Sequence, residues 1–306
     1  MIHRKLLAFL IPMLFAPALV FAANVNELLQ KTETAEKHVS YRGTKVATFH
    51  FAGGLMSAKF KVVHLLPDQT RTEFFTPTAL SGIIVIQDGP KFWKYYPRHN
   101  IWEESSSHLA IPADTIHEET LRNFDLRLIG TDTVAGRPTY IVFAMPHNRL
   151  DSARRVWIDK DCYLIMRSQI ESPHGSVVNS SRFTSIQINP SDISSSAFKV
   201  TGKVRQARKT VDRRFNVIKP TYLPKGYKLI GISRMSVNGY CSAHLQFSNG
   251  ASVISMFQRK AGKDAAISPV KSKVTNVLTW AHNGIRFMLM GDVPTSELRK
   301  IATSTK

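Results

Sequence analysis

The sequence predicts a mainly β protein in two units: an N-terminal curved antiparallel half-barrel with helices, resembling an unclosed barrel, and a small C-terminal α+β domain. Between residues 41 and 189, polar and apolar side chains alternate in about ten short runs separated by turn residues, which is typical of hairpin-linked strands. A segment with helical spacing precedes these runs, and a polar, basic stretch follows them. The 306 residues, 43% of them hydrophobic, are enough for two modest cores.

The N-terminus has the features of a secretory signal peptide over residues 1–22. Arg4 and Lys5 precede an apolar run over 6–21, and small residues follow, with the expected cleavage after Ala22. The alternative, an uncleaved anchor, is disfavoured because two prolines interrupt the run and it is shorter than the roughly 20 residues that span a bilayer. We therefore expect export to the periplasm, with peripheral membrane contact at most.

Residues 23–198 are expected to form the half-barrel. Val25, Leu28 and Leu29 begin a helical pattern after the cleavage site, and a second short helix is expected over 113–123. Asp88 and Gly89 provide turn chemistry between two of the strands. The expected strands are 44–51, 56–66, 70–77, 81–87, 91–96, 124–134, 137–146, 153–159, 162–171 and 177–189.

A basic linker over 199–215 and a second unit over 216–306 are expected to follow. The second unit has two hairpin signals, Asn249-Gly250 and Asn283-Gly284, each between alternating runs. A closing helix over 296–304 is expected, capped by Thr295 or Ser296. Strands alternating with one terminal helix indicate a small α+β domain.

The charge balance favours an acidic partner. The formal net charge is +19, and removal of the signal peptide with its two basic residues leaves +17. Nucleic acid is disfavoured, because the protein is expected to be exported and no helix-turn-helix, RNA-recognition or zinc-finger pattern is present. Anionic lipid, the phosphates of lipopolysaccharide, or an acidic protein segment fit better.

The basic linker holds the candidate partner-binding side chains. The alternative interpretation of such a run is a solvated linker. The candidates are Arg205, Arg208, Lys209, Arg213 and Arg214.

No catalytic, metal or cofactor motif supports an enzyme. The sequence has no glycine-rich phosphate loop, no G-x-S-x-G and no H-E-x-x-H, because Leu121 stands where the second histidine of "HEETL" would be. The 11 histidines are scattered without ligand spacing. We therefore expect a protein that is not an enzyme and binds neither a metal nor a cofactor.

Two cysteines raise the question of a disulfide in an oxidising compartment. Cys162 lies in a predicted hairpin turn, and Cys241 lies in the second unit. A bond would connect the two units, provided that the Cα atoms come within about 4.4–6.8 Å. The alternative is two unpaired residues.

Apolar side chains on neighbouring strands suggest a wall that accepts acyl chains. Several of these strands carry too little polar content to have one solvent-exposed face, so both faces are expected to be covered. The alternative is an ordinary two-sided core. The candidate lining residues are Phe49, Phe51, Phe60, Ile84, Ile86, Trp93 and Tyr95.

Several of these segments together resemble the RseB/MucB family of periplasmic sigma-E regulatory proteins. They include "IVIQDGPKFWKYYP", "AGRPTYIVFAMPH", "YLPKGYKLI", "LQFSNGASVISMF" and "NGIRFMLMGDVPTSELRKIA". The resemblance covers essentially the whole mature chain. The first half is also similar to the lipoprotein carriers LolA and LolB, whereas the second half is specific to RseB.

The resemblance implies a regulator of the envelope stress response. Such a protein binds the periplasmic domain of an anti-sigma factor (RseA/MucA-like), protects it from proteolysis, and senses lipid or lipoprotein acyl chains, or lipopolysaccharide. The rival function is a LolA-like periplasmic carrier of lipid or lipoprotein, which needs no residues beyond 216. The two cysteines belong to no pattern of the family.

Overall fold

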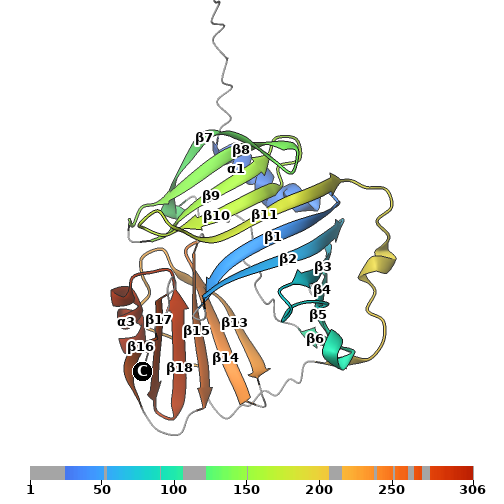
Figure 1. Cartoon of the computed structure of the whole chain (residues 1–306). Helices are drawn as coiled ribbons and strands as arrows, with labels where there is room; N and C mark the ends of the chain where they lie inside the picture. Colours follow the sequence, from blue (N-terminus) through green and yellow to red (C-terminus); the bar gives the residue numbers. More distant parts are fainter. Residues whose placement is uncertain are drawn as a thin grey trace, which may run out of the picture.

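The computed structural model contains two separate antiparallel sheets joined by one connecting segment (Figure 1). The mainly β architecture expected from the sequence is confirmed. The described residues are 25–51, 54–89, 91–105, 122–149, 151–206, 216–237, 240–250, 252–260, 265–270 and 276–305. The expected signal peptide and most of the expected helix at 113–123 lie outside them.

The first sheet contains 12 strands among the described residues, in the order β12-β6-β5-β4-β3-β2-β1-β11-β10-β9-β8-β7. Nearly all neighbours are antiparallel, as hairpin connections require, and β12 alone is parallel to its neighbour β6. The strands are β1 (Tyr41–Phe51), β2 (Gly54–Leu65), β3 (Gln69–Thr76), β4 (Ile84–Asp88), β5 (Lys91–Tyr96), β6 (Ile101–Ser105), β7 (Phe124–Val134), β8 (Arg137–Pro146), β9 (Ala153–Asp159), β10 (Ile165–Glu171), β11 (Val177–Ile188) and β12 (Val204–Gln206).

One helical segment covers part of one face of this sheet, which we call the α1 face. Helix α1 (Val25–Thr34) buries Leu28 and Leu29 against Val156 and Ile158 of β9 and their neighbours. The 3-10 turn η1 (Ala35–Lys37) continues the segment over β1 and β2. The helical spacing in the sequence therefore predicted the correct element, in which Leu28 and Leu29 are buried and Val25 is half-buried.

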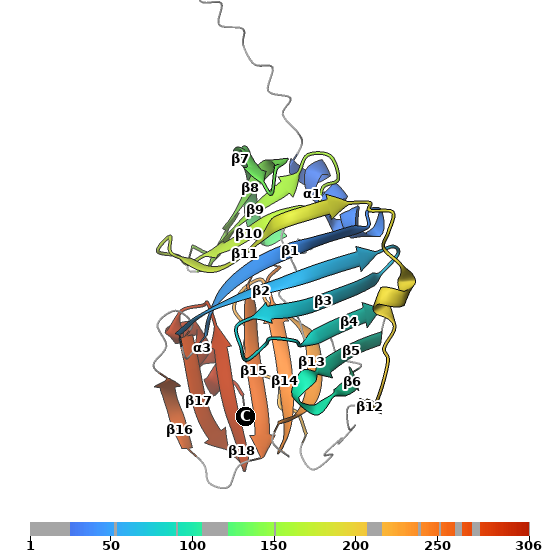
Figure 2. The ribbon, with the colours of Figure 1, turned by 45° about the vertical axis from the view of Figure 1, so that its right-hand side comes forward.

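A non-strand segment, residues 189–203, crosses the opposite face, and we call this segment the strap and that face the strap face (Figure 2). Backbone hydrogen bonds fix both of its ends, from Asn189 N to Ser40 O (2.7 Å) and from Trp102 N to Lys203 O (3.0 Å). Between them, the turn η3 (Ser195–Phe198) buries Phe198 against Ile86 and Trp102. A second 3-10 turn, η2 (Pro97–His99), links β5 to β6.

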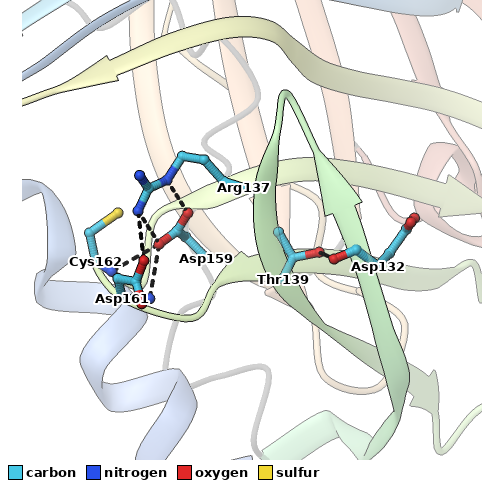
Figure 3. Close-up of polar contacts among 6 residues, drawn as sticks. All are labelled: Asp132, Arg137, Thr139, Asp159, Asp161 and Cys162. Carbon is cyan, nitrogen blue, oxygen red and sulfur yellow. Dashed lines mark hydrogen bonds and ion pairs between the residues drawn. The ribbon is translucent and has the colours of Figure 1, made fainter.

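A buried ion pair fixes the turn between β9 and β10 (Figure 3). Arg137 Nε and Nη2 donate to the two carboxylate oxygens of Asp159 at 2.5 and 2.9 Å, and Asp159 is fully buried. The amides of Asp161 and Cys162 donate to the same carboxylate. Burial raises the pKa of Asp159, but the hydrogen bonds from Arg137 and these amides outweigh it and lower the pKa overall. The pair is compensated, so it specifies the turn without leaving an isolated charge.

The second sheet has its own core. Its described strands follow the order β13-β14-β15-β18-β17-β16, and helix α3 (Thr295–Thr303) packs its buried Leu298 and Ile301 against one face. The strands are β13 (Lys228–Val237), β14 (Tyr240–Ser248), β15 (Val253–Lys260), β16 (Ala265–Val270), β17 (Asn276–His282) and β18 (Ile285–Gly291).

One expectation is corrected by the described residues. The N-cap of α3 is Pro294, because the Thr295 hydroxyl donates to the side chain of Asn276 (3.0 Å) and does not cap the helix. Within the expected linker 199–215, residues 204–206 form β12 of the first sheet. The exact limits of the two units stay a prediction.

No helix in the described part of the chain is both long enough and apolar enough to cross a membrane.

Candidate binding surfaces

The structure divides the candidate acyl-binding residues between the two faces of the first sheet. Strand pairing places Ile84 beside Tyr95 and Ile86 beside Trp93, all on the strap face. The strap covers this group, and Ile86 is fully buried. These four residues are therefore brought together, but their contacts are already made by the chain itself.

Phe60 lies on the α1 face, away from that group. It packs on Phe74 of β3 with ring centroids 5.2 Å apart, beside Ala58 and the half-buried Met56 of the same strand. We call Met56, Ala58, Phe60 and Phe74 the apolar patch. The side chains of Phe49 and Phe51 lie outside the described residues, although the backbone of Phe49 pairs with Met56. Of the apolar patch, only Phe60 was among the predicted lining residues, and the strap does not cover it.

The two sheets meet in a small polar seam. Asn249, in the β14–β15 connection, donates from Nδ2 to Asp151 Oδ2 (3.3 Å), and its backbone oxygen accepts from Asn123 Nδ2 (3.1 Å). Gly226 has φ +87°, and a Cβ there would lie 2.7 Å from Asn123 Oδ1, so close approach of the two units requires glycine. Asp151 and Ser152 of the first unit and Asn249 and Ser252 of the second are all buried.

Asp151 is the unusual group of this seam. It is 4% exposed and accepts hydrogen bonds from two neutral amides, those of Asn148 and Asn249, but forms no ion pair among the described residues. Burial raises its pKa to about 6, with the Asn249 hydrogen bond opposing and the charge of Glu297 adding to the effect. At neutral pH, the ionised carboxylate of Asp151 therefore weakens the contact between the two sheets.

Only one of the five candidate partner-binding residues is described. Arg205 lies on β12, is exposed, and donates from Nη2 to Glu103 Oε2 of β6 at 2.7 Å. The other candidates, Arg208, Lys209, Arg213 and Arg214, lie outside the described residues. Their role in partner binding stays a prediction.

Cys162 is a free cysteine in the structure, and the disulfide considered with Cys241 stays a prediction. Burial raises the pKa of the Cys162 thiol to about 11. The thiol therefore stays protonated at neutral pH and is a poor nucleophile. The side chain of Cys241 lies outside the described residues.

Across the described ranges, no group of three or more His, Cys, Asp or Glu side chains could hold a metal ion.

Sequence reasoning missed the strap, the seam and a row of basic side chains on the strap face. The strap contains single apolar residues without a period, so nothing distinguished it from a polar boundary. The seam and the row arise from strand register and from contacts between distant segments, which a single sequence does not reveal.

Comparisons with known proteins agree with this architecture. Residues 24–205 match the family model described as the MucB/RseB N-terminal domain. A search of curated proteins finds no match. Among solved structures, MucB in complex with the periplasmic part of MucA has a TM-score of 0.67 at 18% identity, covering 91% of this chain and 97% of that one.

Two further solved structures give the same fold. The MucA/MucB complex of Pseudomonas aeruginosa has a TM-score of 0.67 at 16% identity, covering 92% of this chain and 97% of that chain. MucB alone has a TM-score of 0.66 at 15% identity, covering 93% and 98%. The shared fold therefore extends over both sheets.

The burial of Asp151 in the seam predicts that the free energy of unfolding depends on pH, and that substitution of this one residue removes the dependence. The pKa of Asp151 is raised from 3.8 to about 6, so its penalty is absent below about pH 4 and complete above about pH 6. Relative to Asp151→Asn, the wild-type protein should lose up to about 3 kcal/mol of unfolding free energy between pH 4 and pH 7, at 1.36 kcal/mol per pKa unit. Chemical denaturation of both proteins at several pH values measures this difference.

Asp68→Asn is the control for that experiment, because Asp68 is an exposed turn residue. Its difference from wild type should not change with pH by more than about 0.5 kcal/mol. A wild-type-minus-Asp151→Asn difference that is constant from pH 4 to pH 7 would contradict a strained carboxylate in the seam.

Proposed function

The chain belongs to the MucB/RseB family, and we propose that it is a negative regulator of the sigma-E envelope stress response which binds the periplasmic domain of an anti-sigma factor. In this role it shields the bound segment from proteolysis. Proteins of this family are binding and regulatory proteins of the periplasm, not enzymes. The expected signal peptide agrees with export.

One observation carries the proposal: the family match over 24–205 continues into a shared fold that includes the second sheet. The MucB structures cover more than nine tenths of this chain, and two of them were solved with MucA. A protein built only to carry lipid would not need the second sheet. Here that sheet has an extensive core of its own and is hydrogen-bonded to the first through Asn249.

The charge supports an acidic partner segment. The mature chain is expected to carry a net charge of +17, with a concentration of basic residues between the two sheets. Electrostatic attraction of this kind raises the association rate more than it raises the final affinity. It also makes binding depend on salt, because the Debye length is about 10 Å at 0.1 M.

We further propose that the protein senses lipid or lipoprotein acyl chains through the apolar patch on the α1 face. The strap occupies the other apolar group, whereas Met56 and Phe74 of the apolar patch are only half-buried. Each acyl CH₂ removed from water contributes about 0.8 kcal/mol, so a partly buried chain binds usefully. Lipid would then release the anti-sigma segment only if it favours a different arrangement of the two sheets. A LolA-like carrier is the alternative function.

Removal of the basic linker charges should weaken partner binding. In the full-length protein, substitution of five basic residues by alanine should reduce affinity for the periplasmic segment of an anti-sigma factor by about tenfold at 0.1 M salt, and by more at lower salt. Titration calorimetry measures both values. The residues are Arg205, Arg208, Lys209, Arg213 and Arg214.

A second five-site variant serves as the control, because it removes the same charge elsewhere on exposed sites. It should bind within about twofold of wild type, since only distant, screened charges change. Equal affinities of the two variants would show that the linker has no special part in binding. The control sites are Lys37, Lys91, Arg98, Arg127 and Arg299.

A photoreactive fatty acid should label the α1 face of delipidated protein. We expect cross-links at the apolar patch, including Met56 and Phe74, because this apolar surface is not closed by the strap. Mass spectrometry locates the labelled residues. Labels confined to Trp93 and Tyr95 would assign the acyl chain to the strap face instead, and the absence of uptake would remove the lipid-sensing proposal.

A further inference from the structure

A row of directly opposed residues crosses six strands of the strap face, from β8 to β2. Each residue is the cross-strand partner of the next, so all six side chains leave the sheet on the same side. Three of these side chains are cations and three are apolar or aromatic. The residues of this row, which we call the cationic row, are Lys59, Val46, Arg182, Arg167, Trp157 and Ile141.

Two arginines stand directly opposite each other at the centre of the cationic row. Arg167 of β10 is the register partner of Arg182 of β11, and neither has an ion pair within the described part of the chain. Like charges at directly opposed positions destabilise a sheet. A third arginine on the same face, Arg155, is already paired with Glu171 at 3.1 Å. Among the described residues, Asp132 is the acidic group whose charge acts on Arg167, but it forms no direct ion pair with either arginine.

Arg167 is held in place by an aromatic ring. Its guanidinium lies over the Trp157 ring, 4.1 Å from the centroid, and Trp157 Nε1 donates to Asp132 Oδ2 at 3.0 Å. Burial lowers the pKa of Arg167, with Asp132 opposing and the charges of Arg182 and Arg155 adding to the effect. Stacking on an aromatic ring fixes the plane of a guanidinium and so reduces the entropy lost on binding.

The position of the two arginines favours a compact oxyanion over a peptide. β10 and β11 are interior strands, paired on both sides, so a peptide strand cannot add to their backbone. Opposed residues in an antiparallel pair have Cα atoms about 4.5–5.5 Å apart, and the charge of Arg182 is close enough to Arg167 to contribute to the lowering of its pKa. Arginine is the side chain best suited to bind phosphate oxygens in pairs.

We propose that Arg167 and Arg182, supported by Trp157, form a binding site for a phosphate group. Lys59, exposed at the other end of the cationic row, extends the positive surface. The site goes beyond the proposed function, because neither an anti-sigma segment nor an acyl chain is needed to fill it. Free phosphate and the phosphate of a lipid headgroup share this chemistry.

Binding by the full-length protein tests the site in two arms. The first arm titrates inorganic phosphate and pyrophosphate by calorimetry. The second measures co-sedimentation with phosphatidylcholine vesicles with and without phosphatidylglycerol. The double variant Arg167→Gln/Arg182→Gln should lose at least about tenfold in affinity in one or both arms. Loss in the vesicle arm alone assigns a lipid headgroup, and loss in both arms assigns a site that also takes free phosphate.

Two further variants keep the test decisive. Arg182→Gln changes only an exposed side chain, so it should fold normally and still weaken binding. Arg98→Gln/Arg299→Gln removes the same charge from exposed sites away from the cationic row and should bind within about twofold of wild type. Equal binding by wild type and the double variant, or an equal loss in the control, would overturn the proposal. A loss of binding to a glutamate-rich peptide with both phosphate arms unchanged would overturn it in favour of an acidic protein ligand.

Discussion

One short helix has to cover a sheet that is much too large for it. Helix α1 has 10 residues and is therefore about 15 Å long, whereas 12 strands at about 4.8 Å extend about 55 Å. An antiparallel sheet tolerates one solvated face, but both faces of this sheet carry apolar side chains. The remaining architecture supplies further cover: the strap closes β3 to β6 on one face, and the second sheet contacts one end of the first.

The apolar patch and the cationic row differ in their chemistry. The apolar patch around Phe60 suits hydrocarbon, and the cationic row suits an anion. Fixed polar contacts keep these surfaces in position, including the Arg137–Asp159 pair that closes the β9–β10 turn beside Trp157. The seam, by contrast, rests on neutral amides around the single carboxylate of Asp151. Because the first sheet is rigid and the second is held to it only weakly, binding at one surface would be able to change how the second sheet is placed against the first.

Local sequence signals predicted most of the elements and little of how they are assembled. The alternation in "RRVWID" and "IMRSQIE" predicted β9 and β10, and Asn283-Gly284 predicted the β17–β18 turn, where both residues have positive φ. The candidate acyl-binding wall was only partly correct, because alternation does not reveal which face of neighbouring strands coincides. Phe60 and Ile86, for example, lie on opposite faces of the sheet, and only the register of the strands between them shows this. The burial of Asp151 depends on a residue 98 positions away, so no local pattern announces it.

The central claim is that the surfaces left open by α1 and the strap are the binding surfaces. Hydroxyl-radical footprinting tests it on the full-length protein, alone and with the periplasmic segment of an anti-sigma factor. Residues that α3 covers, such as Leu289 and Phe287, are fully buried in the protein alone and should not change. The account predicts new protection at exposed or half-buried residues of the first sheet and along the segment between the sheets. Protection confined to the exposed side of α3 and the edge strand β16, with no change in the first sheet, would contradict it.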